Sequence, residues 1–226
     1  CQTERRESRL SIDNFDLALA RHLEARLTDG GRLEPGPWAV LVRACRQAKE
    51  TLLGENPPER ITVHLPGRSA RLIGGGMQIE VTRDEAREVL VEGFFPRVPL
   101  GERPRSRVSG FQEFGLPYAP DAAITRYLGA FLDVHRHAGA EEHEQVADHD
   151  PARPDLVLFN GAVFNSPELR ERLLAAISGW FAGAAGDWRP IVLRNDRLDL
   201  AVARGAAYFG MVRRGEGVRI AAGLAR

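Results

Sequence analysis

The sequence predicts an α/β protein, and the pattern of its last third leads to this class. Residues 155–159 form a continuous apolar run that is typical of a buried parallel strand, and residues 190–193 form a second. Each run is followed by a helical pattern, over residues 166–181 and 199–211. The second of these helices is rich in small residues, so we expect it to pack tightly on the sheet. Strand and helix signals that alternate in this way predict a parallel sheet with crossover helices. The first hundred residues instead mix helices with short alternating strands, which predicts an α+β part.

Two amphipathic helices are predicted near the start of the chain. Residues 13–28 carry a broad leucine stripe together with Phe15, and two glycines after Asp29 end the pattern. A second helix is predicted from Pro37 to about Leu53, because proline suits the first turn of a helix.

Short strands are predicted next. Residues 60–65 alternate between apolar and polar side chains. Residues 70–73 and 77–81 flank the three glycines 74–76, which predicts a hairpin turn between them. The alternative reading of the glycines is a phosphate-binding loop, but no helix follows them directly.

The middle of the chain reads as a helix, a loop, a second helix and a linker. A capping box at residues 82–85 starts a helix that reaches the proline- and glycine-rich loop 96–120. Asp121 can cap a helix that ends at about His135. Residues 136–154 are polar and acidic, so they are the best candidate for a linker.

The composition excludes several classes of protein. The chain has 31 basic and 31 acidic side chains, and this zero net charge argues against nucleic acid as the main partner. No apolar run approaches the roughly 18 residues of a membrane span, so we expect no membrane partner. Cys1 and Cys45 are too few for a disulfide framework, which favours a reducing, cytoplasmic location. Because the chain begins with Cys1 and shows no signal peptide, we expect a piece of a longer protein.

Two segments could bind a ligand. Residues 160–167 connect the end of a predicted parallel strand to a helix N-terminus, a place where α/β sheets bind ligands. An ordinary strand-to-helix turn is the alternative. On the second predicted helix, Arg46 and Lys49, the only lysine of the chain, share a face with Leu53, and Glu50 is adjacent. That face could instead be a solvated surface of ion pairs.

Other chemical signals are weaker. His135, His137, His143 and His149 lie among acidic residues and are ligand types that zinc accepts, but their spacing fits no compact site. A solvated linker is the alternative reading. The sequence has no GxxxxGK[ST] phosphate loop and no GxSxG nucleophile elbow.

Five segments occur in the order known from one family. They are residues 14–18 (NFDLA), 44–52 (ACRQAKETL), 82–95, 157–161 (VLFNG) and 199–207 (DLAVARGAA). This succession resembles the second lobe of the nucleotide-binding domain of 70-kDa heat-shock chaperones, and within them a bacterial DnaK-like subfamily. The last two segments are the most specific, and the resemblance spans nearly the whole chain.

The resemblance implies a fold and a division of the chain. The fold would be the second lobe of an actin-like ATPase, which is ribonuclease H-like, truncated at its N-terminal strands and carrying an α+β outer subdomain. Residues 1–12 would be a poorly ordered lead-in and 13–95 the outer subdomain. Residues 96–154 would form a loop, a helix and the linker, and 155–226 the C-terminal part of the inner subdomain.

The resemblance also implies residues that contact adenosine. Lys49 falls on the lysine of the adenine-contacting helix, although Arg46, Glu50 and Leu53 replace an acidic residue, an arginine and a serine of the family pattern. Two charges of this helix are therefore inverted.

A second group of adenosine contacts is implied near the C-terminus. Asn160, Gly161 and Ala162 fall on the Gly-Gly-Ser of the adenosine loop. Phe164 falls on an arginine that stacks on the base, a role that its ring could also fill. Asp199 falls on an aspartate that supports this loop, although capping its own helix explains it equally well.

The resemblance limits what the chain can do alone. Both phosphate loops and the catalytic lysine of the family are absent, so we expect no catalytic residues and no phosphoryl transfer here. The implied ligands are ATP or ADP, with Mg²⁺, client proteins and co-chaperones belonging to the intact parent. The alternative is a non-catalytic interaction module whose nucleotide face has decayed, and a weaker one is a metal-binding protein. Loss of sheet strands predicts self-association through an exposed edge.

Overall fold

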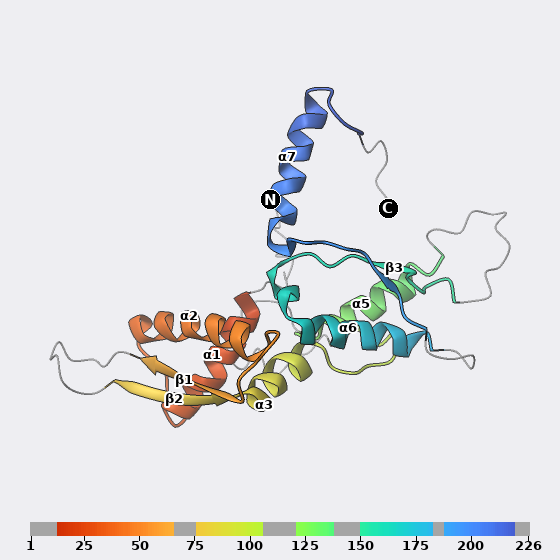
Figure 1. The fold of residues 1–226 in the computed structure, drawn as a ribbon. Coiled ribbons are helices and arrows are strands. Elements are labelled where there is room, and N and C mark those ends of the chain that lie inside the picture. The colour runs from red at the N-terminus through yellow and green to blue at the C-terminus, as the bar shows by residue number, and fades with distance from the viewer. Residues whose placement is uncertain (1–12, 66–75, 106–120, 138–149, 183–187, 220–226) are drawn as a thin grey trace, which may run out of the picture.

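The computed structural model describes residues 13–65, 76–105, 121–137, 150–182 and 188–219. Its described part is a mixture of helices and two small sheets, which is compatible with the predicted α/β class. Figure 1 shows one body built from the first elements, a second built from later ones, and a last helix that projects away from both. The predicted lead-in 1–12 and strand 70–73 lie outside the described residues, as does most of the linker.

The two N-terminal helices form where they are predicted. Helix α1 spans Asp13–Leu27 and helix α2 spans Pro35–Leu52, with proline in its first turn. Leu19 and Leu23 of α1 are fully buried, as are Leu41 and Leu52 of α2. The two helices contact each other along this apolar face, so the leucine stripe correctly predicted the core-facing side.

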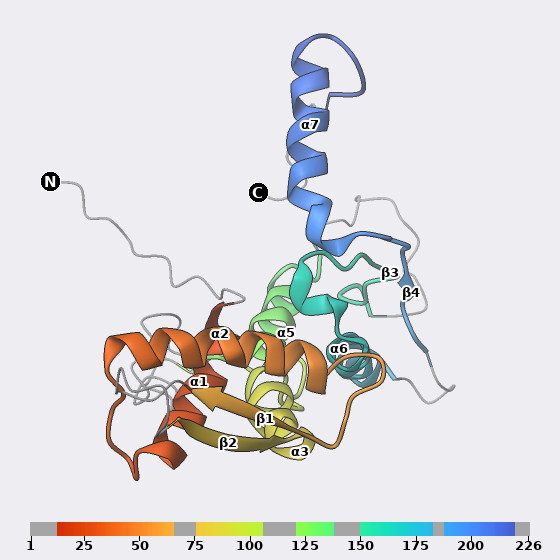
Figure 2. The same ribbon diagram turned by 60° about the vertical axis from the view of Figure 1, so that its left-hand side comes forward.

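The first sheet is an antiparallel pair. Strand β1 (Arg60–Leu65) pairs with strand β2 (Met77–Thr82), and Leu65 lies opposite Met77. The partner of β2 among the described residues is β1, whereas the predicted hairpin strand 70–73 lies outside them. Figure 2 shows the pair lying beneath α1 and α2. Val63, Ile79 and Val81 point into the core, as the alternation predicts.

The capping box is formed as predicted. Thr82 accepts a hydrogen bond from the Glu85 amide at 3.2 Å, and the Glu85 carboxylate accepts one from the Thr82 amide at 3.4 Å. Helix α3 (Arg83–Ala86) continues directly into η1 (Arg87–Glu92), a π-helical turn with wider spacing between bonded residues. The helical segment ends just before the loop 96–105, close to the predicted boundary.

Asp121 organises the start of the next helix without capping it directly. Helix α5 spans Ile124–Val134. The buried Asp121 carboxylate accepts hydrogen bonds from the Ala123 amide at 3.0 Å and the Arg105 amide at 2.9 Å. It also pairs with Arg126 one turn into the helix, at 3.1 Å. The side chain therefore holds the loop before α5 and its first turn together.

The second sheet differs from the prediction in burial and length. Strand β3 (Leu156–Val157) pairs in parallel with strand β4 (Ile191–Val192), and helix α6 (Pro167–Trp180) connects them. The parallel pair was correctly predicted, but each strand has only two residues and Leu156 and Ile191 are more than half exposed. The prediction of buried strands was wrong because apolar composition shows what can be buried and does not supply a covering layer.

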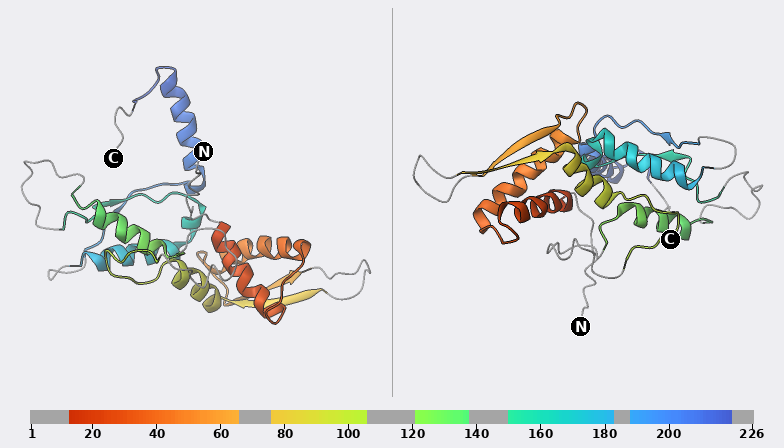
Figure 3. Two further views of the ribbon diagram at one scale, coloured as in Figure 1. Left: turned by 180° about the vertical axis from the view of Figure 1, so that it is seen from behind. Right: turned by 90° about the horizontal axis from the view of Figure 1, so that it is seen from below.

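The last helix also departs from the prediction. Helix α7 spans Ala201–Arg213 after the short turn η3 (Leu198–Leu200), and none of its residues is buried. The small residues of α7 predicted tight packing on the sheet, yet Val202 is 86% exposed and Phe209 is 63% exposed. The left view of Figure 3 shows the helix standing clear of the rest of the described chain. The expected packing was wrong because the described element that α7 contacts most is the adjoining turn η3, not the sheet.

Aromatic side chains join the two bodies. The rings of Phe15 and Phe94 stack with centroids 4.0 Å apart, and Phe95 lies 6.1 Å from Phe15. Phe164 continues the series, 6.3 Å from Phe95 and 4.9 Å from Phe159. One buried apolar cluster therefore contains side chains from both sides of residue 95, where the sequence predicted a subdomain boundary. The subdomain boundaries stay predictions.

Cys45 gives the stability of the protein a pH dependence. Burial, aided by the nearby Asp16 charge, raises the pKa of its thiol from 9.0 to about 12. Below pH 9.0 the thiol is neutral in both states; above it the unfolded chain loses the proton and the folded chain keeps it. Between pH 9.0 and about 12, the unfolding free energy of wild type should therefore fall relative to that of Cys45→Ala, by up to about 1.4 kcal/mol per pH unit.

Urea unfolding of both proteins at about pH 8 and about pH 10.5 measures this loss, since other titrating groups cancel in the comparison. A difference in unfolding free energy that stays constant over this range would contradict the buried thiol.

Candidate functional site

Two segments more than a hundred residues apart line one pocket. The end of α2 supplies Lys49 and Glu50, and Gly54 follows it. The other wall comes from the turn η2 (Ala162–Asn165) and the start of α6. The two walls are bonded directly, because the Ser166 hydroxyl donates a hydrogen bond to the Leu53 carbonyl at 2.6 Å. The same hydroxyl accepts one from the Leu169 amide at 3.3 Å and so caps α6.

Lys49 is buried at one side of this pocket. Its side chain is 8% exposed, and its ammonium donates a hydrogen bond to Asp16 Oδ1 at 2.6 Å. Arg46, one turn earlier on α2, donates from Nε to Asp16 Oδ2 at 2.9 Å. The Asp16 carboxylate, itself 1% exposed, thus holds both cations. The ammonium also lies 5.9 Å from the centre of the Phe15 ring.

The charges around the pocket cancel. Asp16 and Glu50 carry two negative charges, and Arg46 and Lys49 carry two positive ones. Glu50 is exposed and lines the pocket mouth with Lys49. The pocket therefore has no excess positive charge for a phosphate group, and most of its accessible lining is apolar.

Residues 195–198, which come later in the chain, hold the loop before η2 by hydrogen bonds. Gly161 has a φ of 92°, a conformation that favours glycine, and its amide donates a hydrogen bond to the Leu198 carbonyl at 2.9 Å. Asn195 donates to Asn160 Oδ1 at 2.6 Å and to the Phe159 carbonyl at 3.1 Å. The loop therefore has a defined shape without a ligand.

The predicted adenosine contacts are only partly brought together. Lys49 and Ala162 line the same pocket, and Asn160 and Gly161 lie just beyond it in the loop. Phe164 turns its ring to Phe95 and Phe159 and is not among the residues that line the pocket. This orientation gives no support to the predicted stacking of Phe164 on a base.

Asp199 lies in the turn η3 and does not cap α7. Its exposed carboxylate accepts hydrogen bonds from Arg197 at 3.1 and 2.9 Å, and Arg197 holds the pKa of Asp199 below its usual value. The neighbouring Leu198 carbonyl, which binds the Gly161 amide, is what links this turn to the loop. Support of the loop from this segment thus comes through the backbone.

The pocket is small. Its volume is about 90 Å³, whereas sites for small organic ligands usually measure about 300–1,000 Å³. The lining combines apolar with a few polar side chains beside the N-terminus of α6, but the volume does not hold a whole nucleoside. A nucleoside would therefore fit only after the loop 160–165 moved away from α2.

No metal site is found among the described residues. Within them, no group of three or more His, Cys, Asp or Glu side chains could hold an ion. His135 is among the described residues, and the centre of its ring lies 4.5 Å from the centre of the Phe131 ring. His143 and His149 lie outside the described residues. None of the described helices is both long enough and apolar enough to cross a membrane.

Sequence reasoning missed the residue at the centre of the site. Asp16 lies within the apolar stripe of α1 and is as deeply buried as its leucine neighbours. An aspartate on a core-facing helix position needs a buried cation or several donors, and the chain offers one lysine. An aspartate within the apolar stripe, in a chain with a single lysine, was therefore the sequence signal that could have predicted this buried ion pair.

Replacing Ser166 should loosen the contact between the pocket walls. Ser166→Ala removes both the cap of α6 and the bond to Leu53, so we expect a loss of about 1–2 kcal/mol in the unfolding free energy. Ser178→Ala on the same helix is the matched control. The buried Ser178 hydroxyl has no hydrogen-bond partner among the residues that the structure describes, so its removal should cost nothing. Equal losses for the two variants in urea unfolding would contradict the assigned role of Ser166.

Comparison with known proteins adds no relative. No protein-family model matches the chain, and no curated protein matches it.

Proposed function

We propose that the chain is part of a DnaK-like chaperone ATPase and carries the adenosine side of its nucleotide site. The observation that supports this best is the meeting of residues 49–54 and 162–166 at one pocket. The resemblance predicts that these two segments face each other, and nothing in their separation along the chain requires it. In this proposal the fold is the second lobe of an actin-like ATPase, and the chain alone transfers no phosphoryl group.

The residues of the pocket have defined parts in this proposal. At the start of α6 the Leu169 and Arg170 amides are bonded to Ser166 and Pro167 has no N–H, so the Glu168 amide is the donor that a ligand would use. Gly161 and Ala162 allow close approach to the backbone. Lys49 contributes the aliphatic part of its side chain, because its ammonium is engaged by Asp16. Bound nucleotide would supply the γ-phosphate chemistry only in a parent protein with phosphate loops and Mg²⁺.

The test is a thermal-shift titration of the whole chain with ADP, ATP and adenosine. A ligand at a hundred times its dissociation constant adds about 2.7 kcal/mol to the stability of the protein that binds it. Glu50→Arg removes a negative charge from the pocket mouth, so it should raise the ADP-induced shift. Glu59→Arg, an exposed change away from the pocket, is the matched control.

Two outcomes would contradict the nucleotide proposal. One is the absence of a shift at millimolar nucleotide for both wild type and Glu50→Arg. The other is an equal gain in ADP binding from Glu50→Arg and Glu59→Arg, which would show a general charge effect rather than a local one.

A second candidate is a non-catalytic interaction module. The pocket volume of about 90 Å³ and the engaged Lys49 favour a nucleotide face that no longer binds its ligand. Large apolar side chains are exposed on β3, β4 and α7, among them Leu156, Ile191 and Phe209. Surfaces of this kind mark protein partners, including client proteins, co-chaperones or a second copy of the chain.

Self-association follows from the same surfaces. Both strands of the parallel pair β3–β4 have an outer edge that the other described strands do not cover. We expect light scattering to show a mass that rises with protein concentration. A strict monomer at high concentration would contradict pairing through this edge.

A further inference from the structure

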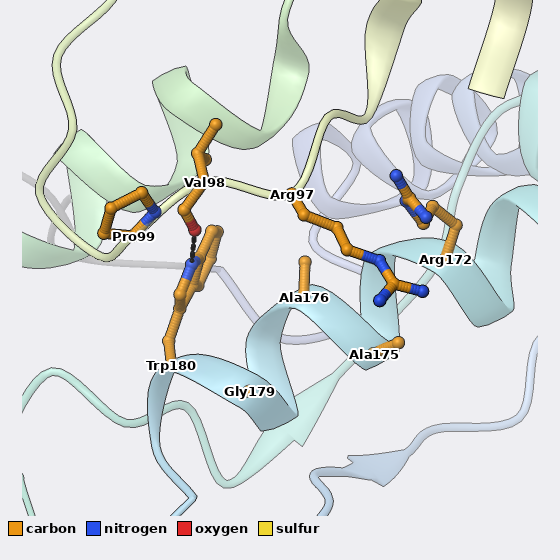
Figure 4. A pocket seen from close by; sticks show the side chains of 8 residues that line it. All are labelled: Arg97, Val98, Pro99, Arg172, Ala175, Ala176, Gly179 and Trp180. Atoms are coloured by element: carbon orange, nitrogen blue, oxygen red, sulfur yellow. Dashed lines mark hydrogen bonds between the residues drawn. The ribbon is translucent and has the colours of Figure 1, made fainter. Parts of the chain in front are cut away.

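A second, larger pocket lies on α6, away from the α2–η2 pocket. It measures about 500 Å³ and shares no lining residue with the first. Figure 4 shows it between the chain that follows the helical segment 83–94 and one face of α6. Its walls are formed by Arg97, Val98, Pro99, Arg172, Ala175, Ala176, Gly179 and Trp180. The volume is within the range of sites for small organic ligands.

The apolar part of this pocket is held in place. The Trp180 indole donates a hydrogen bond from Nε1 to the Val98 carbonyl at 2.6 Å, which fixes the ring against the loop. A Cβ built on the buried Gly129 of α5 would lie 3.5 Å from the Trp180 ring, so helix α5 supports this ring closely. A Cβ built on Gly179 would meet nothing within 4 Å, so the floor beside it is open. A flat apolar group can therefore lie on α6 next to the indole.

One end of the pocket carries an uncompensated positive charge. Arg172 donates to the Phe95 carbonyl at 2.8 Å and pairs with Glu92, so its charge is balanced. Arg97 is exposed and points its guanidinium over the α6 floor toward Ala175. No described residue forms a hydrogen bond or ion pair with Arg97. The pocket thus presents one free guanidinium beside an apolar, aromatic floor.

We propose that this pocket binds a planar aromatic monocarboxylate. The guanidinium fork matches the two oxygens of a carboxylate, and the single free charge matches one negative group. The indole and the alanine floor take the ring by stacking and apolar contact. A phosphate dianion would carry one charge too many and no group for the apolar end.

The test measures binding of 2-naphthoate to the whole chain by calorimetry and ligand-observed NMR. We expect a dissociation constant at or below about 1 mM, and clearly weaker binding of uncharged 2-naphthalenemethanol, of acetate and of inorganic phosphate. Arg97→Gln removes the charge from an exposed position and should weaken naphthoate binding about tenfold. Gly179→Leu fills the floor, and leucine favours a helix, so binding should be lost while the fold is kept.

The control is Arg194→Gln, which removes an 88% exposed arginine outside the pocket and should leave naphthoate binding unchanged. Three results would overturn the proposal: no naphthoate binding at about 5 mM, equal binding of the acid and the alcohol, or equal effects of Arg97→Gln and Arg194→Gln. None of these results bears on the nucleotide proposal, because the two pockets share no residue.

Discussion

Asp16→Asn should lower the unfolding free energy by about 3 kcal/mol, one of the two largest losses that we expect from a single substitution. The carboxylate is 1% exposed and is the hydrogen-bond acceptor of the buried Lys49 ammonium. Without its charge, the ammonium would remain in the core unpaired, and a buried unpaired charge is costly. The Arg46 guanidinium contributes little to this loss because it is 55% exposed and can be solvated.

Urea unfolding at neutral pH measures the effect, and Glu80→Gln is the matched control. Glu80 pairs with Arg60 on the surface of β1 and β2, with both side chains at least half exposed, so we expect a change below about 1 kcal/mol. Replacing both partners, with Asp16→Leu and Lys49→Met, should recover most of the lost stability. A small effect of Asp16→Asn, or no recovery in the double variant, would show that Lys49 reaches solvent.

Phe95→Ala should cost about 4 kcal/mol, because it opens a cavity where the two bodies of the protein meet. The side chain is fully buried, and its ring lies within 6.1 Å of the Phe15 ring and 6.3 Å of the Phe164 ring. The loss combines the removed apolar surface with the contacts that neighbouring rings no longer make.

The same unfolding measurement with Phe131→Ala serves as the control. Phe131 is 54% exposed on α5, so its truncation should change the unfolding free energy by less than about 1 kcal/mol. If wild type itself unfolded in two separate transitions, the bodies would be independent folding units and the shared core would not couple them.

The elements that local signals define were predictable from the sequence. The leucine stripe of α1, the alternation in β1 and the capping box at Thr82 depend only on neighbouring residues, and each forms as predicted. The partner of β2 was not predictable, because strand pairing depends on contacts between distant segments. The exposure of β3, β4 and α7 was missed because an apolar pattern cannot state whether a covering element is present.

The candidate site was predictable in its location and not in its chemistry. The region of Lys49 and the loop after Asn160 line one pocket, whereas their contact with adenosine stays a prediction. The engagement of Lys49 by Asp16 could not be read from either motif, since α1 lies outside both. The direction of the Phe164 ring and the small volume of the pocket depend on side-chain packing, which spacing alone does not determine.

The π-helical turn at residues 87–92 makes this stretch sensitive to changes in length. Neighbouring residues of an α-helix point about 100° apart, yet Leu90 and Val91 are both buried, and so are Phe94 and Phe95. The wider turn contains one residue more than an α-helical turn. This extra residue determines the direction about the helix axis in which the side chains after it point. Deleting a single residue here would rewind the turn and swing both phenylalanines away from Phe15, so homologous chains should conserve the residue count of this turn more strictly than its composition.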